Sequence, residues 1–313
     1  MILAELKKTL FGHKGIIVIL LLLIYNAYWL YSTNEIFIED EGYKETRKCY
    51  EKYEGKIDRE LIETVKRDYE IVGPGENIGA AYRQFISEAE EQLATKEDPY
   101  VVYRWGWIAL IYNPRTNTSL ITFGLIFSVI IFALDSDSKV RNLLNTSYLG
   151  RRNLIFSRFA VYSGLSLLFV LMQGILEFVM ADRLIGVGCL SAPIQSIIES
   201  SPMNISLIGT YVITMLLKLL GLLMGGIIIC FISSMIRSMY LSAIVSVMVF
   251  MEYYFFSYLY EKSYLLPEHL FCSYRYFEGT DIKKPLKITF VIMILAIAGT
   301  YVFNSEKSRR KLV

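Results

Sequence analysis

The sequence predicts an all-α membrane protein with six transmembrane helices, both termini in the cytoplasm and a helical domain outside the membrane between helices one and two. Three observations predict this fold class. The chain of 313 residues is 54% apolar, with a mean hydropathy of +0.41. Apolar runs close to the length that crosses about 30 Å of hydrocarbon recur along it. Lys and Arg gather in alternate loops, although the net charge is only +2.

The apolar runs define the six spans. Residues 1–14 form a short amphipathic segment, and no small-residue cleavage site follows the next apolar run, so we expect that run to be retained as a helix. The predicted spans are residues 15–31, 117–134, 158–180, 205–235, 238–258 and 287–303. The fourth is longer than a bilayer requires, which indicates either a tilted helix or a re-entrant start.

Basic residues set the orientation of these spans. Lys or Arg residues occur in 1–14, in 135–157, at Arg237 and in 304–313, which places these segments in the cytoplasm. Between residues 32 and 115, 18 acidic residues outnumber 12 basic ones. The outer loops are therefore 32–116, 181–204 and 259–286, and the last of these, with its proline and many aromatics, is expected to be a re-entrant or gate segment.

The first outer loop, residues 32–116, is long enough to form a small helical domain. Apolar residues recur at helical spacing from Tyr43 to Tyr69 with a break near Gly55, which predicts one or two amphipathic helices. Residues 73–75 predict a turn and residues 78–93 a further helix. This domain is either a simple cap or a substrate gate or partner-docking domain.

The end of that loop carries two further signals. Asp98-Pro99 predicts the start of a helix, because Pro suits the first helical position. The Trp-rich stretch 100–112 is typical of a segment that lies at the outer leaflet.

Motifs of catalysis and of metal binding are missing from the sequence. The Gly-rich stretch 73–80 lacks the Lys-Ser/Thr ending of a nucleotide-binding P-loop. The four cysteines have no metal-ligand spacing, and Cys189 and Cys272 either form a disulfide in the outer loops or remain free. No basic, aromatic surface for nucleic acid is evident. We therefore expect a non-catalytic chain that binds no metal, cofactor or nucleic acid.

Four polar residues interrupt the predicted spans. They are Gln173, Glu177, Lys218 and Glu252. Ionisable groups are costly in hydrocarbon and usually face the bundle interior or water. These residues either line a substrate path or reach to the nearest membrane surface by snorkelling. Gly221, Gly225 and Gly226 indicate close helix packing in the fourth span.

The loop between the second and third spans is basic and partly amphipathic. Leu143, Leu144, Tyr148 and Leu149 are apolar, and charged residues flank them: Asp135, Lys139, Arg141, Arg151 and Arg158. A short helix here either rests on anionic lipid headgroups or fits a groove on a cytoplasmic partner.

This layout resembles the permease subunit of ABC-2 type ABC transporters. The resemblance rests on the amphipathic segment 1–13 that leads into the first span like an elbow helix, on the six spans, and on the order of features after the second span. That order is Asp135, the run Asn142–Ser147, the Ser-x-x-Gly-Arg element Ser147–Arg151, and Arg158. Two features depart from the family pattern: the outer loop 32–116 is larger than in compact members, and Asp135 stands where Glu is frequent.

The resemblance implies an exporter subunit with no covalent chemistry of its own. Two permease chains, identical or homologous, form the path, and two copies of an ATPase subunit bind ATP and Mg²⁺ beneath it. The apolar and charged residues of the loop between the second and third spans, from Asp135 to Arg158, couple the permease to that ATPase. The expected location is a bacterial plasma membrane, and the expected substrate is a peptide, antimicrobial or other amphiphile. The alternatives are a sensor or scaffold whose outer domain binds a peptide or partner, and an ion-coupled carrier.

Overall fold

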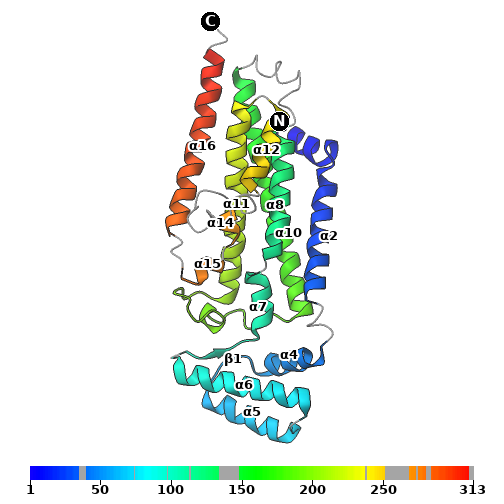
Figure 1. Ribbon diagram of the computed structural model, residues 1–313, viewed down its shortest axis with the longest axis vertical. Helices are drawn as coiled ribbons and strands as arrows, with labels where there is room; N and C mark the ends of the chain where they lie inside the picture. Colours follow the sequence, from blue (N-terminus) through cyan, green and yellow to red (C-terminus); the bar gives the residue numbers. More distant parts are fainter. Residues whose placement is uncertain are drawn as a thin grey trace.

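The computed structural model describes residues 1–34, 40–73, 75–96, 98–112, 114–133, 148–236, 238–250, 268–272, 274–279 and 283–309. Across these residues the chain is almost entirely helical, which confirms the all-α prediction. Its long helices run side by side in one bundle, and a smaller helical domain lies beyond one end of that bundle (Figure 1).

The bundle is built from six apolar helices. They are α2 (Gly15–Thr33), α8 (Pro114–Ser128), α10 (Tyr148–Leu184), α11 (Leu207–Met235), α12 (Met239–Phe250) and α16 (Lys283–Arg309). Short helical pieces accompany them: α1 (Ile2–Lys7) with the π-helix η1 (Lys8–Gly12), the π-helix η2 (Val129–Ala133), the 3₁₀ turn η4 (Ile194–Ser196), α14 (Glu268–Phe271) and α15 (Tyr274–Phe277).

Three described segments are long and apolar enough to cross a membrane. They are Gly15–Thr33, Leu154–Leu184 and Leu207–Met235. The apolar parts of the other three bundle helices, Asn117–Phe132, Tyr240–Phe250 and Leu286–Val302, are shorter. A helical membrane protein is therefore supported, and the six-span topology stays a prediction. The start of α1 and the C-terminal end of α16 lie at the same end of the bundle (Figure 1).

The smaller domain, which we call the outer domain after its predicted location, folds around a small core of its own. It comprises α4 (Glu41–Tyr53), β1 (Gly55–Lys56), α5 (Arg59–Val72), α6 (Glu76–Thr95), β2 (Tyr100–Val101) and α7 (Arg104–Ile111). Asp40 and Asp58 cap α4 and α5 by accepting backbone N–H groups. Tyr50, Val65 and Phe85 are buried between the helices. The predicted break at Gly55 and the helix over 78–93 are confirmed, and of the one or two amphipathic helices predicted, the structure has two.

One prediction for the end of this domain is wrong. Asp98-Pro99 starts no helix, because the next two residues form β2 and pair antiparallel with β1, a distant part of the chain. In the Trp-rich stretch 100–112, Trp107 of α7 is fully buried and donates a hydrogen bond from Nε1 to the carbonyl of Gly188 at 2.9 Å. The location of this stretch at the outer leaflet stays a prediction.

The helix that contains the predicted third span begins before that span does. Helix α10 starts at Tyr148, ten residues before the expected boundary at 158, so the second half of the expected loop 135–157 is helical. Leu and Arg, which are frequent in this stretch, favour helix. The α11 helix is continuous, so no re-entrant start is present there. No disulfide joins Cys189 to Cys272, so the disulfide alternative is not realised in the structure.

Glycines allow large aromatic rings to fill the bundle core. A side chain at Gly225 would overlap the ring of Phe250 from α12, and one at Gly226 would overlap the ring of Tyr162 from α10. Both rings are fully buried. The close packing expected of this glycine pattern is therefore present, with aromatic side chains rather than a second backbone against the glycines.

We expect Gly226→Leu to prevent α10 and α11 from packing, because the new side chain has to displace the Tyr162 ring; overpacking of this kind costs about 1–3 kcal/mol or more. The matched control is Gly164→Leu on α10, where a Cβ meets no atom within 4 Å. Size-exclusion profiles and melting temperatures of the purified chains measure the difference. Equal profiles for the two variants would contradict the packing role of Gly226.

Candidate functional site: a polar cluster inside the helix bundle

Three long helices bring polar side chains together inside the bundle. Gln173 and Glu177 are four residues apart on α10 and therefore lie on one face of that helix. Asn26 lies on α2 and Lys218 on α11. All four side chains are buried, with exposed fractions of 1–2%. We call these four residues the polar cluster.

The carboxylate of Glu177 is the centre of the polar cluster. Its Oε1 accepts a hydrogen bond from Asn26 Nδ2 at 2.9 Å and another from Gln173 Nε2 at 2.9 Å. The first bond joins α2 to α10. A further bond joins α11 to α10, because the hydroxyl of Tyr211 donates to the carbonyl of Gly174 at 2.8 Å. The three helices are thus linked by polar contacts at one level of the bundle.

Lys218 stands apart from these hydrogen bonds. Its ammonium is attracted electrostatically by the Glu177 carboxylate. Within the described part of the chain, however, no hydrogen bond or ion pair joins Lys218 to another residue. This attraction between opposite charges reduces the free-energy cost of burying each of them.

The position of the cluster along the helices decides between two interpretations of these charges. At 1.5 Å per residue, Asn26 and Glu177 lie about 10 Å, and Lys218 about 16 Å, from the outer ends of their helices. Snorkelling side chains extend along the protein surface to reach water. The polar cluster is buried instead among neighbouring helices, so snorkelling does not describe it. Whether the cluster lines a path stays a prediction.

The remaining predicted site residues fall into two groups. Residues 135–144, which include Asp135, Lys139, Arg141, Leu143 and Leu144, lie outside the described part of the chain, as does Glu252. Tyr148, Leu149 and Arg151 belong to the first turn of α10, and Arg158 lies half-buried further along the same helix. The structure therefore gathers Gln173, Glu177 and Lys218, and leaves the coupling hypothesis untested.

Two members of this region were missed by the sequence interpretation. The sequence does carry a signal for Asn26, because this residue is an amide in the middle of an otherwise apolar run. Tyr211 gave no comparable signal, because tyrosine near a helix end usually marks the membrane interface. Its role depends on the Gly174 carbonyl of another helix.

A second arrangement holds the outer domain to the end of α10. The guanidinium of Arg47 donates from Nη1 to the carbonyl of Arg183 at 3.2 Å and from Nη2 to that of Asp182 at 3.1 Å. These carbonyls belong to the last turn of α10, where no helical N–H is left to satisfy them. Glu51 accepts from Arg47 Nε at 2.6 Å and holds the guanidinium in place. We call this contact the Arg47 clamp.

The loop after α10 is fixed by the same domain. Lys96 donates to the carbonyl of Gln195 at 2.9 Å. Glu54 accepts the backbone N–H of Tyr103 at 3.3 Å and lies against Gly188, where a larger residue would overlap its carboxylate. Burial raises the pKa of Glu54 and lowers that of Lys96. The outer domain and residues 181–204 thus form one packed unit.

No metal site is evident, since the described residues contain no group of three or more His, Cys, Asp or Glu side chains that could hold an ion. Comparison with known proteins gives no match to a family model, to a curated protein or to a solved structure.

We expect Tyr211→Phe to destabilise the bundle, because it removes the hydrogen bond to Gly174. Hydrogen bonds between membrane helices average about 0.6 kcal/mol and reach about 1.7 kcal/mol. Tyr240→Phe is the matched control: Tyr240 lies on α12 with 77% of its surface exposed. Melting temperatures in a non-ionic detergent measure both. A loss no greater for Tyr211→Phe than for the control would show that the bond contributes nothing.

We expect Arg47→Met to loosen the end of α10. Hydrogen bonds to charged groups contribute about 1.5–3 kcal/mol when buried, and the partial exposure of this contact reduces that to about 1 kcal/mol. Amide hydrogen exchange of residues 183–188 should become faster. The control is Lys48→Met, one residue along α4, whose side chain is 68% exposed and pairs only with Glu45 among described residues. Unchanged amide exchange in Arg47→Met would show that the Arg47 clamp does not stabilise the end of α10.

Proposed function

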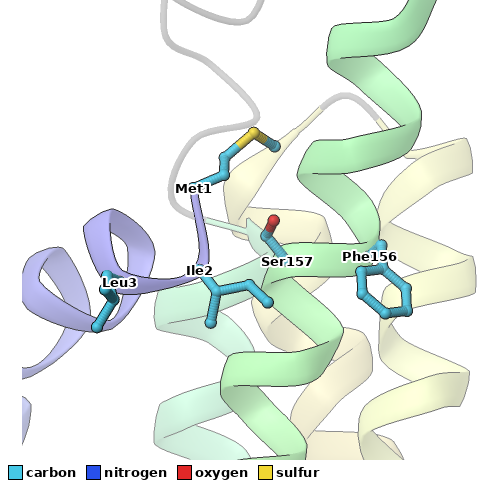
Figure 2. Close-up of a pocket in the computed structure, with 5 residues that line it drawn as sticks. All are labelled: Met1, Ile2, Leu3, Phe156 and Ser157. Atoms are coloured by element: carbon cyan, nitrogen blue, oxygen red, sulfur yellow. The ribbon is translucent and has the colours of Figure 1, made fainter.

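We propose that this chain is the membrane-spanning permease subunit of an ATP-binding cassette exporter of the ABC-2 type. The observation that carries the proposal is the arrangement at the end of the bundle where α1 and α10 begin. Helix α1 packs across the base of α10, and Figure 2 shows Met1, Ile2 and Leu3 beside Phe156 and Ser157, around a pocket of about 370 Å³. The sequence resemblance implies an amphipathic elbow helix that leads into the first span, and α1 with η1 leads into α2 in this way.

The coupling segment fits this proposal by its position in the chain. Residues 135–147 come directly before α10, so a force on them acts on the base of that helix. Helix α10 is continuous over 37 residues, or about 55 Å. A tilt or shift imposed at its base therefore reaches both the polar cluster and the Arg47 clamp.

In the proposed mechanism, two partner ATPase subunits bind ATP and Mg²⁺, close on one another and displace Leu143–Leu149 of each permease chain. The displacement of α10 moves Gln173 and Glu177 relative to α2 and α11, and so opens the path between the helices. A second permease chain, identical or homologous, completes the path. The residues of this chain have a mechanical role and perform no covalent chemistry.

The substrate in this proposal is a peptide, an antimicrobial or another amphiphile, and the location is a bacterial plasma membrane. The polar cluster supports a substrate with polar groups, because it offers hydrogen-bonding side chains deep inside an apolar bundle.

A second candidate function has one observation in its favour. The outer domain has its own hydrophobic core, as expected of a unit that binds a peptide or a partner. In that case the chain is a membrane sensor or scaffold. The cytoplasmic partner separates the two functions: an exporter requires an ATPase, and a sensor requires a signalling protein.

The proposal predicts that a P-loop ATPase copurifies with the tagged chain in a mild detergent, and that Leu144→Asp abolishes this copurification. A charge at this apolar anchor disrupts a hydrophobic docking surface. The control is Ile71→Asp, the same kind of change at a residue of the outer domain that is 83% exposed. Mass spectrometry of the purified complex identifies and counts the partner.

Loss of the ATPase in Leu144→Asp but not in Ile71→Asp supports both the exporter and the coupling role of residues 143–149. Full retention in Leu144→Asp would contradict the coupling role. Capture of a signalling protein instead of an ATPase, or of no partner after cross-linking, would contradict the exporter.

A further inference from the structure

Lys218 has hydrogen-bonding capacity that the described residues of the protein do not use. Its ammonium carries three donors, the side chain is 2% exposed, and no described residue accepts a hydrogen bond from it. A charge buried in this way is strongly unfavourable unless it is paired and hydrogen-bonded. The electrostatic attraction by Glu177 offsets part of this cost. It does not provide an acceptor for the three N–H donors of Lys218 among the described hydrogen bonds.

Thr214 has the same property on the same face of α11. It lies four residues before Lys218, so the two side chains are neighbours on the helix. Thr214 is fully buried, and its hydroxyl has no hydrogen-bond partner among the described residues.

Other threonines of the bundle show that this is unusual. Thr122, Thr210 and Thr300 each donate their hydroxyl to the carbonyl four residues earlier, at 2.7–3.0 Å. This is the ordinary way to satisfy a threonine inside a helix. Thr214 does not form this hydrogen bond, although it also lies inside a helix with a carbonyl four residues earlier.

The chemistry of the two side chains indicates which ligand would fit them. Oε1 of Glu177 accepts two amide N–H groups, so Asn26 and Gln173 hold Glu177 in the hydrogen bonds that the structure describes. Lys218 adds a positive charge, and neither Lys218 nor Thr214 donates a hydrogen bond to a described residue. A ligand that completes this site has to be rich in acceptor oxygens and negatively charged.

We propose that Lys218 and Thr214 form a buried binding site for an anionic oxygen group, a carboxylate or a phosphate. Lys218 supplies the charge and Thr214 a hydroxyl donor on the same helix face. The group comes either from an amphiphile that enters the bundle or from a free inorganic ion. This site adds a substrate class, anionic molecules, to the proposed function. The binding itself does not depend on the proposed function, and only a role of the site in transport rests on it.

The test measures binding on the full chain, purified in a non-ionic detergent, without any ATPase. Sodium decanoate is the amphiphilic probe, with decanol as its uncharged control, and sodium phosphate is the inorganic probe at constant ionic strength. A ligand that binds only the folded protein raises the melting temperature in a saturable way. Decanoate or phosphate should do so for the wild-type chain, and decanol should not.

Three variants locate the site. Lys218→Met should abolish the saturable shift. Thr214→Val should weaken the apparent affinity about fivefold, as expected for the loss of one hydrogen bond. Thr210→Val is the matched control, since this threonine is equally buried one turn earlier but its hydroxyl is bonded to Ser206; it should leave the affinity unchanged. If Lys218→Met does not fold, Thr214→Val against Thr210→Val decides alone.

A shift with decanoate alone supports the site with an amphiphile as its source, and a shift with phosphate, alone or together with decanoate, supports it with a free ion as a sufficient ligand. No saturable shift with either probe overturns the inference, as does a shift that Lys218→Met retains. Failure here leaves the ATPase copurification unaffected, so the inference and the proposed function fail separately.

Discussion

A carboxylate inside a membrane bundle must obtain its hydrogen-bond donors from the protein, because the surrounding hydrocarbon offers none. Glu177 meets this requirement with amide groups from two helices, Asn26 of α2 and Gln173 of α10. Neither donor is charged, so the carboxylate is fixed by geometry rather than by a salt bridge. The relative positions of α2 and α10 therefore depend on a contact that cannot slide by one turn without leaving a buried polar group unsatisfied.

The same reasoning makes α10 the helix to which the other parts of the molecule are attached. Its base meets α1, its middle carries the contacts to α2 and α11, and its last carbonyls are bound by Arg47 of the outer domain. A helix transmits displacement along its axis because its backbone hydrogen bonds are internal. A displacement at the base of α10 is therefore transmitted toward the outer domain, through the Arg47 clamp and through the contacts that Lys96 and Trp107 make with the loop after α10.

Local patterns in the sequence predicted what depends on neighbours in the chain. The two outer-domain helices on either side of Gly55 follow from apolar residues at helical spacing, and the all-α class follows from long apolar runs. Three members of the polar cluster were found because ionisable or amide groups are rare in such runs. The contacts that the sequence did not predict involve distant partners: β2 pairs with β1, Trp107 donates to Gly188, and Tyr211 donates to Gly174. No spacing within one segment encodes those contacts.

Within the polar cluster, the groups that hold the carboxylate of Glu177 differ from the group that carries the positive charge. Had Lys218 bonded directly to Glu177, the two charges would form a closed pair, and the cluster would be a structural link between helices. In the structure two neutral amides hold the carboxylate instead, and neither the ammonium of Lys218 nor the hydroxyl of Thr214 donates a hydrogen bond to a described residue. A binding site inside a membrane protein needs this separation: one set of polar groups that positions the helices, and another set that exchanges partners as the ligand enters and leaves.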